Sequence, residues 1–342
     1  MMETLASIGE FGLIRRIRRI LETEGVEGAG VIAGAGDDTA VFAPRAGYDL
    51  LVTCDAMVEG RHYLAGTMEP IDVGRRAMVM NISDIGAMGG WPRWAVVSLG
   101  LADDTPVEAV EALTRGFLEE LNPLNAVLAG GNITKAAGGA FIDITLIGDV
   151  ETGRKVLRSG ACPGDAVLVT GFPGQAAAGL ELLTHGQDPE APGVRSLIDV
   201  YLRPRHRVRE GQAAARTGRV HAMIDISDGF LGDLAHICEE SRVGAEVVEK
   251  ALPVNEPLRR MGGQWGRTPG EMVLAASDDY ELILTCAPED VETVKGTVSS
   301  VAGAAVTEVG RITPEAGRFE VVHADGSRSD AKAKGWDHFA RS

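Results

Sequence analysis

Acidic residues follow apolar runs at several places along this chain. The first example is Gly36-Asp37-Asp38, which lies between the apolar pairs Val31-Ile32 and Val41-Phe42. Adjacent carboxylates between apolar flanks repel each other unless a cation or hydrogen-bond donors offset their charge. Taken alone, this stretch is more typical of a solvated turn between two strands. Similar stretches recur, however, at Thr53-Cys54-Asp55, Asn81-Ile82-Ser83-Asp84, Asp225-Ile226-Ser227-Asp228-Gly229 and Ser277-Asp278-Asp279-Tyr280-Glu281. The recurrence predicts one polyanionic pocket built from distant elements.

Carboxylates delivered in this way suit hard cations. Mg²⁺ prefers oxygen ligands and usually bridges one or two carboxylates to substrate phosphates. Phosphoryl transfer depends mainly on positioning and charge neutralisation, which such a cluster supplies. The chain has no GxxxxGK[ST] P-loop, no HRD or DFG signature, no GxSxG elbow and no HExxH zinc motif. The residues alone therefore predict a Mg²⁺-dependent enzyme acting on phosphates, outside the common nucleotide-binding folds.

Composition excludes several classes of protein. With 342 residues, the chain is long for one core, which favours two domains. Acids exceed bases by 49 to 33, which argues against nucleic-acid or anionic-membrane partners. The four cysteines are far apart and form no CxxC pair, as expected for reduced thiols. No apolar run approaches the ~20 residues of a membrane span. We expect a soluble, cytoplasmic protein.

Hydrophobic periodicity predicts the elements that carry these acids. In the first half, helices are expected over residues 1–24, 73–88 and from Thr105 to about Leu121, and strands over 49–54, 94–101, 126–129 and 141–147. In the second half, strands are expected over 166–170, 222–224 and 280–286, and helices around 176–183 and after Asp228. A hinge-like stretch over 151–154 predicts domains 1–154 and 155–342.

Some local signals allow two interpretations. Thr105 with Glu108 resembles a capping box, and Ser227 or Asp228 could cap the helix that follows. Gly130-Gly131 after a strand is either an ordinary turn or a turn whose N–H groups face a phosphate. His62, seven residues after Asp55, is either structural or functional.

The arginines of the first helix either form its solvent-exposed face or contact a phosphate. A GxGxxA match at residues 28–33 is discounted, because it does not follow a strand and open a helix.

An ordered set of motifs runs through nearly the whole chain. It consists of Gly9-Glu10-Phe11-Gly12-Leu13-Ile14, Gly36-Asp37-Asp38, Asp55 with Glu59-Gly60 and His62, Asn81-Ile82-Ser83-Asp84 with Ala87-Met88-Gly89, Arg158-Ser159-Gly160, Asp225-Ile226-Ser227-Asp228-Gly229, Asp279-Tyr280-Glu281-Leu282 and Gly335-Trp336-Asp337-His338-Phe339. This set resembles the thiamine-monophosphate kinases, which share a fold with aminoimidazole ribonucleotide synthetase.

The resemblance implies a two-domain α/β (α+β) fold. Its N-terminal domain would have a mixed sheet with helices that pairs with the sheet of a second subunit in a homodimer. Its C-terminal domain would be α+β, with ATP between the two domains. The implied reaction is direct in-line transfer of the ATP γ-phosphoryl group to thiamine monophosphate, giving thiamine diphosphate. Several Mg²⁺ ions would assist, and no side chain would act as a covalent nucleophile.

The resemblance also assigns roles residue by residue. The implied Mg²⁺ ligands are Asp38, Thr53, Cys54, Asp55, Asp84, Asn132, Asp225 and Asp228, with Thr53 and Cys54 contributing oxygens of the strand end. The implied ATP-binding residues are Gly131, Asn132, Arg158 and Ser227. The implied thiamine-binding residues are His62, Asp278 and Trp336, the last by packing on a flat ring. The roles of Asp37 and Asp279 are not separated from those of their neighbours.

This chain departs from the family pattern at three places. Asn132 stands where the family usually has aspartate, Ala276-Ser277 replaces a Gly-Gly pair, and Arg61 precedes His62 where a smaller residue is common. Two alternatives to the kinase therefore stay open. One is an ATP-dependent enzyme of the same fold with another small phosphate or amine acceptor. The other is a weakly active, nucleotide-binding regulatory homologue.

Overall fold

The computed structural model describes residues 3–26, 30–35 and 39–330, and every structural statement below concerns these residues. The chain divides into two compact units. Unit 1 comprises Met1–Ile85 and Gly90–Thr152, and unit 2 comprises Gly86–Gly89 and Gly153–Ser342. The predicted roles of Asp37, Asp38 and Trp336 lie outside the described residues.

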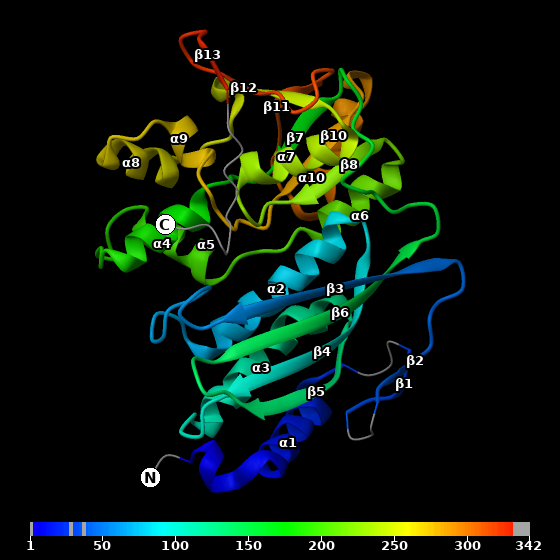
Figure 1. Cartoon of the computed structure of the whole chain (residues 1–342), viewed down its shortest axis with the longest axis vertical. Coiled ribbons are helices and arrows are strands. Elements are labelled where there is room, and N and C mark those ends of the chain that lie inside the picture. The colour runs from blue at the N-terminus through cyan, green and yellow to red at the C-terminus, as the bar shows by residue number, and fades with distance from the viewer. Residues whose placement is uncertain (1–2, 27–29, 36–38, 331–342) are drawn as a thin grey trace. The chain divides into compact units, whose positions relative to one another are not determined.

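Unit 1 is a mixed sheet with helices, as the sequence predicts (Figure 1). The sheet order is β3-β6-β4-β5, with β4 and β5 parallel and the other neighbours antiparallel. A separate ribbon pairs β1 with β2. The elements are α1 (Leu5–Glu24), β1 (Val31–Ala33), β2 (Val41–Phe42), β3 (Tyr48–Val58), α2 (Pro70–Ala87), β4 (Trp91–Leu101), α3 (Val107–Leu121), η1 (Asn122–Leu124), β5 (Val127–Lys135) and β6 (Phe141–Glu151).

Helices α2 and α3 approach each other so closely that backbone meets backbone. A Cβ on Gly74 would overlap the carbonyl oxygen of Leu113, and a Cβ on Gly116 would overlap that of Ile71. Only glycine leaves room for such an approach. Helix α2 is consequently buried along most of its length. This burial fixes the helix that carries Asp84.

The N-terminal helix is amphipathic, as predicted. Leu13 and Ile20 of α1 are buried, whereas its arginines are exposed. Arg16 pairs with Glu3 at 2.7 Å and with Glu111 at 3.1 Å. These contacts fit a solvated helix face. Gly9, with φ of 66°, kinks the helix near its start.

Two local predictions in unit 1 are wrong. Helix α3 begins at Val107 with Pro106 as N-cap and no side-chain cap, so Thr105 does not form a capping box. The strand expected to end at Ala129 continues through Gly130 and Gly131 to Lys135, so the glycines form no turn. Gly131 is needed here for close strand pairing and not for a turn. A Cβ at this position would overlap the carbonyl oxygen of Val97 on the neighbouring strand β4.

Unit 2 has a larger mixed sheet in the order β13-β12-β9-β11-β7-β10-β8, in which only β12 and β9 pair in parallel among the described strands. Its elements are β7 (Ala166–Thr170), α4 (Gln175–Thr184), α5 (Val194–Leu202), α6 (Val208–Thr217), β8 (Val220–Asp225), α7 (Phe230–Ser241), β9 (Gly244–Val248), η2 (Glu249–Ala251), α8 (Glu256–Trp265), α9 (Pro269–Val273), β10 (Leu282–Cys286), η3 (Pro288–Asp290), α10 (Val291–Ala302), β11 (Val306–Thr313), β12 (Phe319–Val322) and β13 (Arg328–Asp330).

Side chains alternate between the two faces of the unit 2 sheet and contribute to a hydrophobic core on each face. In β7, Val167 and Val169 belong to the core with α4, α5, α7 and α8. Their neighbours Ala166 and Leu168 belong to the core with α6 and α10. Side chains alternate between faces with period two, so both faces are covered and the strands read as continuous apolar runs.

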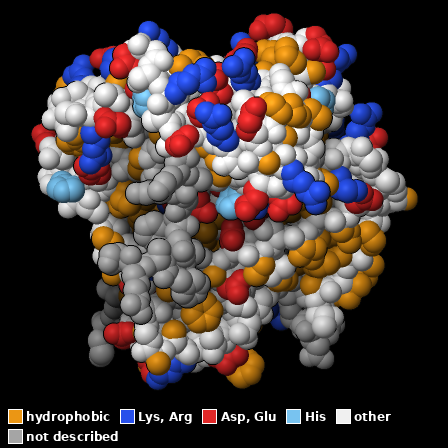
Figure 2. Space-filling view, turned by 45° about the horizontal axis from the view of Figure 1, so that its top comes forward, with side chains coloured by type: hydrophobic (Ala, Val, Ile, Leu, Met, Phe, Trp, Pro, Cys, Tyr) orange, Lys and Arg blue, Asp and Glu red, His pale blue; other side chains and the backbone are white. Residues whose placement is uncertain are grey.

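The surface carries both charge signs. The face seen in Figure 2 shows intermixed basic and acidic side chains, with hydrophobic side chains gathered toward its right-hand side. In unit 1, exposed hydrophobic residues include Leu50, Val52 and Val58 of β3. Among the described residues, no helix combines the length and apolar character that crossing a membrane requires.

The two glycines of β5 should respond differently to substitution by alanine. Gly131→Ala should lower the free energy of unfolding by about 2 kcal/mol, because the added methyl group collides with β4. Gly130→Ala should change it by less than about 1 kcal/mol, because an added Cβ meets nothing within 4 Å. Urea denaturation followed by circular dichroism measures both. Equal stability of the two variants would contradict the close approach of β4 and β5.

Candidate functional site

In unit 1, strand β3 and helix α2 bring several predicted site residues together. The Thr53 hydroxyl donates a short hydrogen bond to Oδ2 of Asp84. Two residues along β3, the Asp55 N–H donates to Oδ1 of Asn81 at 3.2 Å. Thr53 and Asp55 share one face of β3 because strand side chains alternate. Asn81 and Asp84 share one face of α2 because residues three apart are neighbours on a helix.

Asn81 is the buried residue that joins these two elements. It is fully buried in the middle of α2, where an amide needs hydrogen-bond partners. Its Nδ2 donates to the Ala77 carbonyl at 3.1 Å, while its Oδ1 accepts from the backbone of Asp55. The amide therefore holds β3, at Asp55, against α2. The apolar run around Asn81 was the signal for this positioning role, although the residue was not among the predicted ligands.

Cys54 projects from the other face of β3. Its exposed thiol donates to Oδ1 of Asp143 at 3.0 Å and accepts from the Thr145 hydroxyl at 3.6 Å. The hydrogen bond to Asp143 is the main reason why the pKa of the thiol is raised. The Cys54 side chain is thus separated from Thr53 and Asp84. A contribution of Cys54 to ion binding stays a prediction for its backbone oxygen.

Asn132 also lies on this second face of the sheet. It pairs with Ser98 of β4, and Ser98 pairs with Asp143 of β6. Cross-strand partners share a face, so the exposed Asn132 side chain and Asp143 project to the same side. Within unit 1, the structure does not bring the Asn132 side chain to Thr53, Asp55 and Asp84. Its neighbour Gly131 is in strand conformation on β5.

His62 lies in the turn after β3. Its Nδ1 accepts a hydrogen bond from the Val58 N–H at 3.0 Å. An imidazole that accepts at Nδ1 carries its proton on Nε2 when neutral. The half-buried ring is therefore held by its own turn with Nε2 as a donor.

In unit 2, the loop between β8 and α7 carries another group of predicted residues. Asp225 is buried at the end of β8, and Asp228 is half-buried. The backbone N–H groups of Ser227 and Asp228 donate to Oδ2 of Asp233 at 2.9 and 3.0 Å. Helix α7 has Gly229 as N-cap and no side-chain cap, so the prediction that Ser227 or Asp228 caps it is wrong. Asp233 instead organises the loop from inside the first turn.

Asp233 is a candidate residue that sequence reasoning missed. Burial is the main reason why its pKa rises to about 7, and the charge of Asp228 raises it further. The two N–H donors and the charge of Arg158 act in the opposite direction. Asp228, Asp233 and His236 also offer donor atoms within 4.8 Å of one another. An acid in the first turn after the Asp-Ile-Ser-Asp-Gly motif was the available signal.

The structure separates the roles of Asp278 and Asp279. Asp279 is buried and accepts from the N–H groups of Gly174 at 2.6 Å and Ala176 at 2.9 Å. Ser277 accepts from the N–H of Ala177 at 3.0 Å. Both side chains thus satisfy N–H groups at the start of α4, which otherwise lack partners inside the helix. Asp279 is a structural cap, whereas Asp278 is half-buried beside it.

Comparisons with known proteins extend over nearly the whole chain. The family profile "AIR synthase related protein, N-terminal domain" matches residues 36–150, and "AIR synthase related protein, C-terminal domain" matches residues 162–323. The thiamine-monophosphate kinase of Bacillus subtilis (strain 168) is 32% identical, over 96% of this chain and 99% of its own length. The chain belongs to the thiamine-monophosphate kinase family.

Solved structures agree with this family. The thiamine-monophosphate kinase from Stenotrophomonas maltophilia K279a has a TM-score of 0.80 at 32% identity, covering 93% of this chain and 97% of that one. AaThiL complexed with AMPPCP and TMP has a TM-score of 0.77 at 34% identity, covering 99% of each chain. The N-terminal match contains the β3–α2 residues, and the C-terminal match contains Asp225, Asp228 and Asp278. Arg158 and Trp336 lie outside both matches.

The cap at α4 predicts a pH effect on stability. Burial, the largest cause, raises the pKa of Asp279 from its ordinary 3.8 to about 6. Between these values the folded state binds the proton more tightly than the unfolded chain, so this carboxyl's contribution to stability falls as pH rises through the window. Asp279→Asn removes this titration and one acceptor, and should lower the free energy of unfolding by about 1–3 kcal/mol.

Chemical denaturation of wild type and Asp279→Asn at several pH values measures this effect. The advantage of the wild type should shrink between about pH 4 and about pH 6. Asp278→Asn should narrow this window without abolishing it, because the charge of Asp278 is one of the smaller causes of the raised pKa of Asp279. A wild-type advantage that grows with pH would refute the assignment.

Proposed function

We propose that this chain transfers the γ-phosphoryl group of ATP directly to thiamine monophosphate, giving thiamine diphosphate and ADP. The observation that carries the proposal is the similarity to AaThiL complexed with AMPPCP and TMP, an ATP analogue and the acceptor, over 99% of both chains. Matches to family members that cover 96% or more of this chain give further support. In-line transfer needs positioning and charge neutralisation, so no covalent nucleophile is part of the proposal.

The donor atoms in each unit suit Mg²⁺. In unit 1, Thr53, Asp55 and Asp84 offer hydroxyl and carboxylate oxygens from adjacent elements. In unit 2, Asp225 and Asp228 offer carboxylate oxygens, and Asp228 lies close to Asp233, whose pKa is raised mainly by burial and further by the charge of Asp228. An all-oxygen, acid-rich set is typical of Mg²⁺ and phosphate sites. When bound, Mg²⁺ would neutralise the charge of the transferring phosphates.

The remaining roles follow the chemistry of the side chains. Arg158 offers a guanidinium suited to phosphate oxygens, and the segment around Ser227 offers backbone and hydroxyl donors. Asp278 and the Nε2–H of His62 would orient the thiamine moiety, with Trp336 stacking on a flat ring. Asn81 and Asp233 would act indirectly, because they hold the segments that carry the ligands.

The exposed face of β3 supports a homodimer as part of the proposal. Leu50, Val52 and Val58 are 50%, 66% and 36% exposed, in alternation with buried Leu51 and Met57. An apolar strand face left in water is typical of an interaction surface. A sheet paired with its copy would cover it. Cys54 and Cys162 are exposed free thiols, which suits the reducing cytoplasm.

Two alternatives rest on the departures from the family pattern. Ala276-Ser277 replaces two glycines, and the Ser277 hydroxyl is engaged with α4, which could reshape an acceptor site. Another small phosphate or amine would then be the acceptor. Asn132 removes one negative charge from the predicted ligand set, as expected for a weakly active nucleotide-binding homologue. The assays below discriminate between these alternatives and the kinase.

The activity is tested by incubating the purified protein with ATP, Mg²⁺ and thiamine monophosphate and separating the products chromatographically. We expect thiamine diphosphate and ADP in equal amounts. Asp84→Asn should lower kcat/KM by about 100-fold or more, since it removes a charge from the ion site. Asp104→Asn, an exposed acid in the same unit, is the matched control and should retain activity. ADP formation without thiamine diphosphate would contradict the assigned acceptor.

Asn132 gives a separate prediction about the ion site. If Asn132 weakens one Mg²⁺ position, Asn132→Asp should raise the turnover rate at limiting Mg²⁺ and have little effect at saturating Mg²⁺. The charge restored to a ligand set strengthens binding of a hard cation. Rates measured over a Mg²⁺ titration check this. If wild type and Asn132→Asp show the same rate at every Mg²⁺ concentration, residue 132 is not a ligand of the ion.

A further inference from the structure

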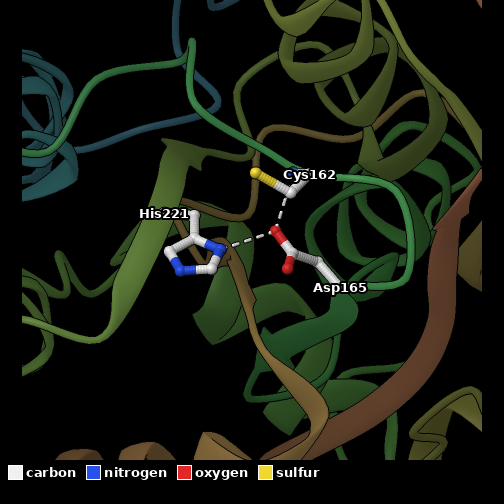
Figure 3. Close-up of side chains that lie close together, drawn as sticks. All are labelled: Cys162, Asp165 and His221. Carbon is white, nitrogen blue, oxygen red and sulfur yellow. Dashed lines mark hydrogen bonds and ion pairs between the residues drawn. The ribbon is translucent and has the colours of Figure 1, made fainter. Parts of the chain in front are cut away.

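Unit 2 contains a cluster of a thiol, a carboxylate and an imidazole outside the proposed kinase site. Cys162, Asp165 and His221 each offer one donor atom, and these atoms lie within 4.8 Å of one another. Figure 3 shows the three side chains close together, with Cys162 and Asp165 in the segment before β7 and His221 on β8. None of them was among the predicted ligands for Mg²⁺, ATP or thiamine. Sequence spacing gives no hint of the cluster, because 56 residues separate Asp165 from His221.

A tight turn positions Cys162 and Asp165. The Asp165 N–H donates to the Cys162 carbonyl at 3.0 Å, and Oδ2 of Asp165 accepts from the Cys162 N–H at 2.8 Å. Gly164 provides the positive φ of 98° that this turn requires. The Gly164 N–H and the Asp165 carbonyl also pair with Ile312 of β11. The buried carboxylate is therefore fixed by backbone contacts at the start of β7.

A β-bulge delivers His221 to this carboxylate. In the β10–β8 pairing, Thr285 faces Ala222 whereas Cys286 faces Val220, so His221 is the extra residue. The core contacts show the same shift, because Val220 packs with the core that contains Met223. Strict alternation would put these two residues on opposite faces. Bulges re-aim side chains, and here Nδ1 of His221 lies 2.8 Å from Oδ2 of Asp165.

The chain before Cys162 is also held beside β8. The Ser241 hydroxyl accepts from the N–H groups of Gly160 and Ala161, both at 3.1 Å. A Cβ on Gly160 would collide with the His221 carbonyl oxygen, so only glycine permits this approach. The Cys162 thiol is exposed and lies 3.5 Å from the Gly160 carbonyl. The side chains of Cys162 and His221 are thus anchored at their backbones and accessible from solvent.

We propose that Cys162, Asp165 and His221 bind one Zn²⁺ ion. A sulfur, a nitrogen and an oxygen donor form the mixed set that Zn²⁺ accepts, whereas Mg²⁺ takes oxygen ligands. With three protein ligands, the fourth position of a tetrahedral ion is left for water or a small ligand. Binding releases the thiol proton, as Zn²⁺ + Cys–SH gives Cys–S–Zn⁺ + H⁺, while the carboxylate and neutral imidazole donate lone pairs.

The required movement is small. Ligand bonds of about 2.0–2.3 Å place donor atoms on a tetrahedral ion about 3.3–3.8 Å apart. Donors as far as 4.8 Å apart need to converge by about 1–1.5 Å, whereas Nδ1 of His221 and Oδ2 of Asp165, now 2.8 Å apart, need to separate by about 0.5 Å. Asp165 is fixed, and rotations of the exposed Cys162 and partly exposed His221 side chains supply both adjustments. The ion would join the start of β7 to β8 across β10, which separates these strands in the sheet.

Cobalt substitution tests the site without reference to kinase activity. The full-length protein is freed of metal with a chelator and titrated with Co²⁺ at saturating Mg²⁺, which occupies oxygen-only sites. A thiolate-to-cobalt charge-transfer band should appear, saturate at about one ion per chain, and vanish on addition of Zn²⁺. Cys162→Ser should abolish the band, and His221→Gln should weaken Co²⁺ affinity by about 100-fold or more.

Matched variants make the result specific. Cys54→Ser removes the other exposed thiol, and His185→Gln removes an exposed histidine of the same unit; both should leave the charge-transfer band unchanged. Circular dichroism of the metal-free proteins confirms that each variant is folded. Absence of the band in the wild type, or its persistence in folded Cys162→Ser, would overturn the proposal. The three residues would then be a hydrogen-bonded turn only.

Discussion

The cost of burying carboxylates governs how this acidic chain is built. Asp279 can be buried because two backbone N–H groups at the start of α4 donate hydrogen bonds to its carboxylate. Glu281 is buried against the guanidinium of Arg207 and the hydroxyl of Thr170. These two acids stabilise the fold through their hydrogen bonds. Asp233 accepts from two N–H groups of the loop that carries Asp228, so it too is structural, although burial and then the charge of Asp228 raise its pKa to about 7. The buried acids of this chain therefore hold backbone segments in place, and candidate ligands such as Asp228 lie on those segments.

The candidate ion site of unit 1 also depends on the close approach of neighbouring backbones. Glycines let α2 meet α3 and let β5 meet β4 without intervening side chains. Since α2 is then buried on most sides, Asn81 can join it to β3 through a single amide. The positions of Thr53 and Asp84 follow from this junction. A substitution that loosens the packing between α2 and α3 would therefore displace Asp84 from Thr53 although it replaces no candidate ligand.

Strand alternation and its interruption decide which side chains meet. Regular alternation in β3 sends Thr53 and Asp55 toward α2 and Cys54 toward Asp143. In β8, a bulge breaks the alternation and aims His221 at Asp165. One extra residue in a strand can thus create a contact that neither segment encodes by itself. The same rule explains why a ligand set inferred from motif order need not share one face of a sheet.

The sequence by itself determined the family, the mixed character of the first sheet and most of the elements, because periodicity and motif order are local properties. It also located Asp225 at the end of a strand, whereas β3 continues past Asp55 to Val58. Only the tertiary structure decided that Asp279 caps a helix, that Gly131 lies within a strand and that Asn132 projects away from Thr53. These outcomes depend on strand register and on partners far away in the chain, and neither is written in local sequence.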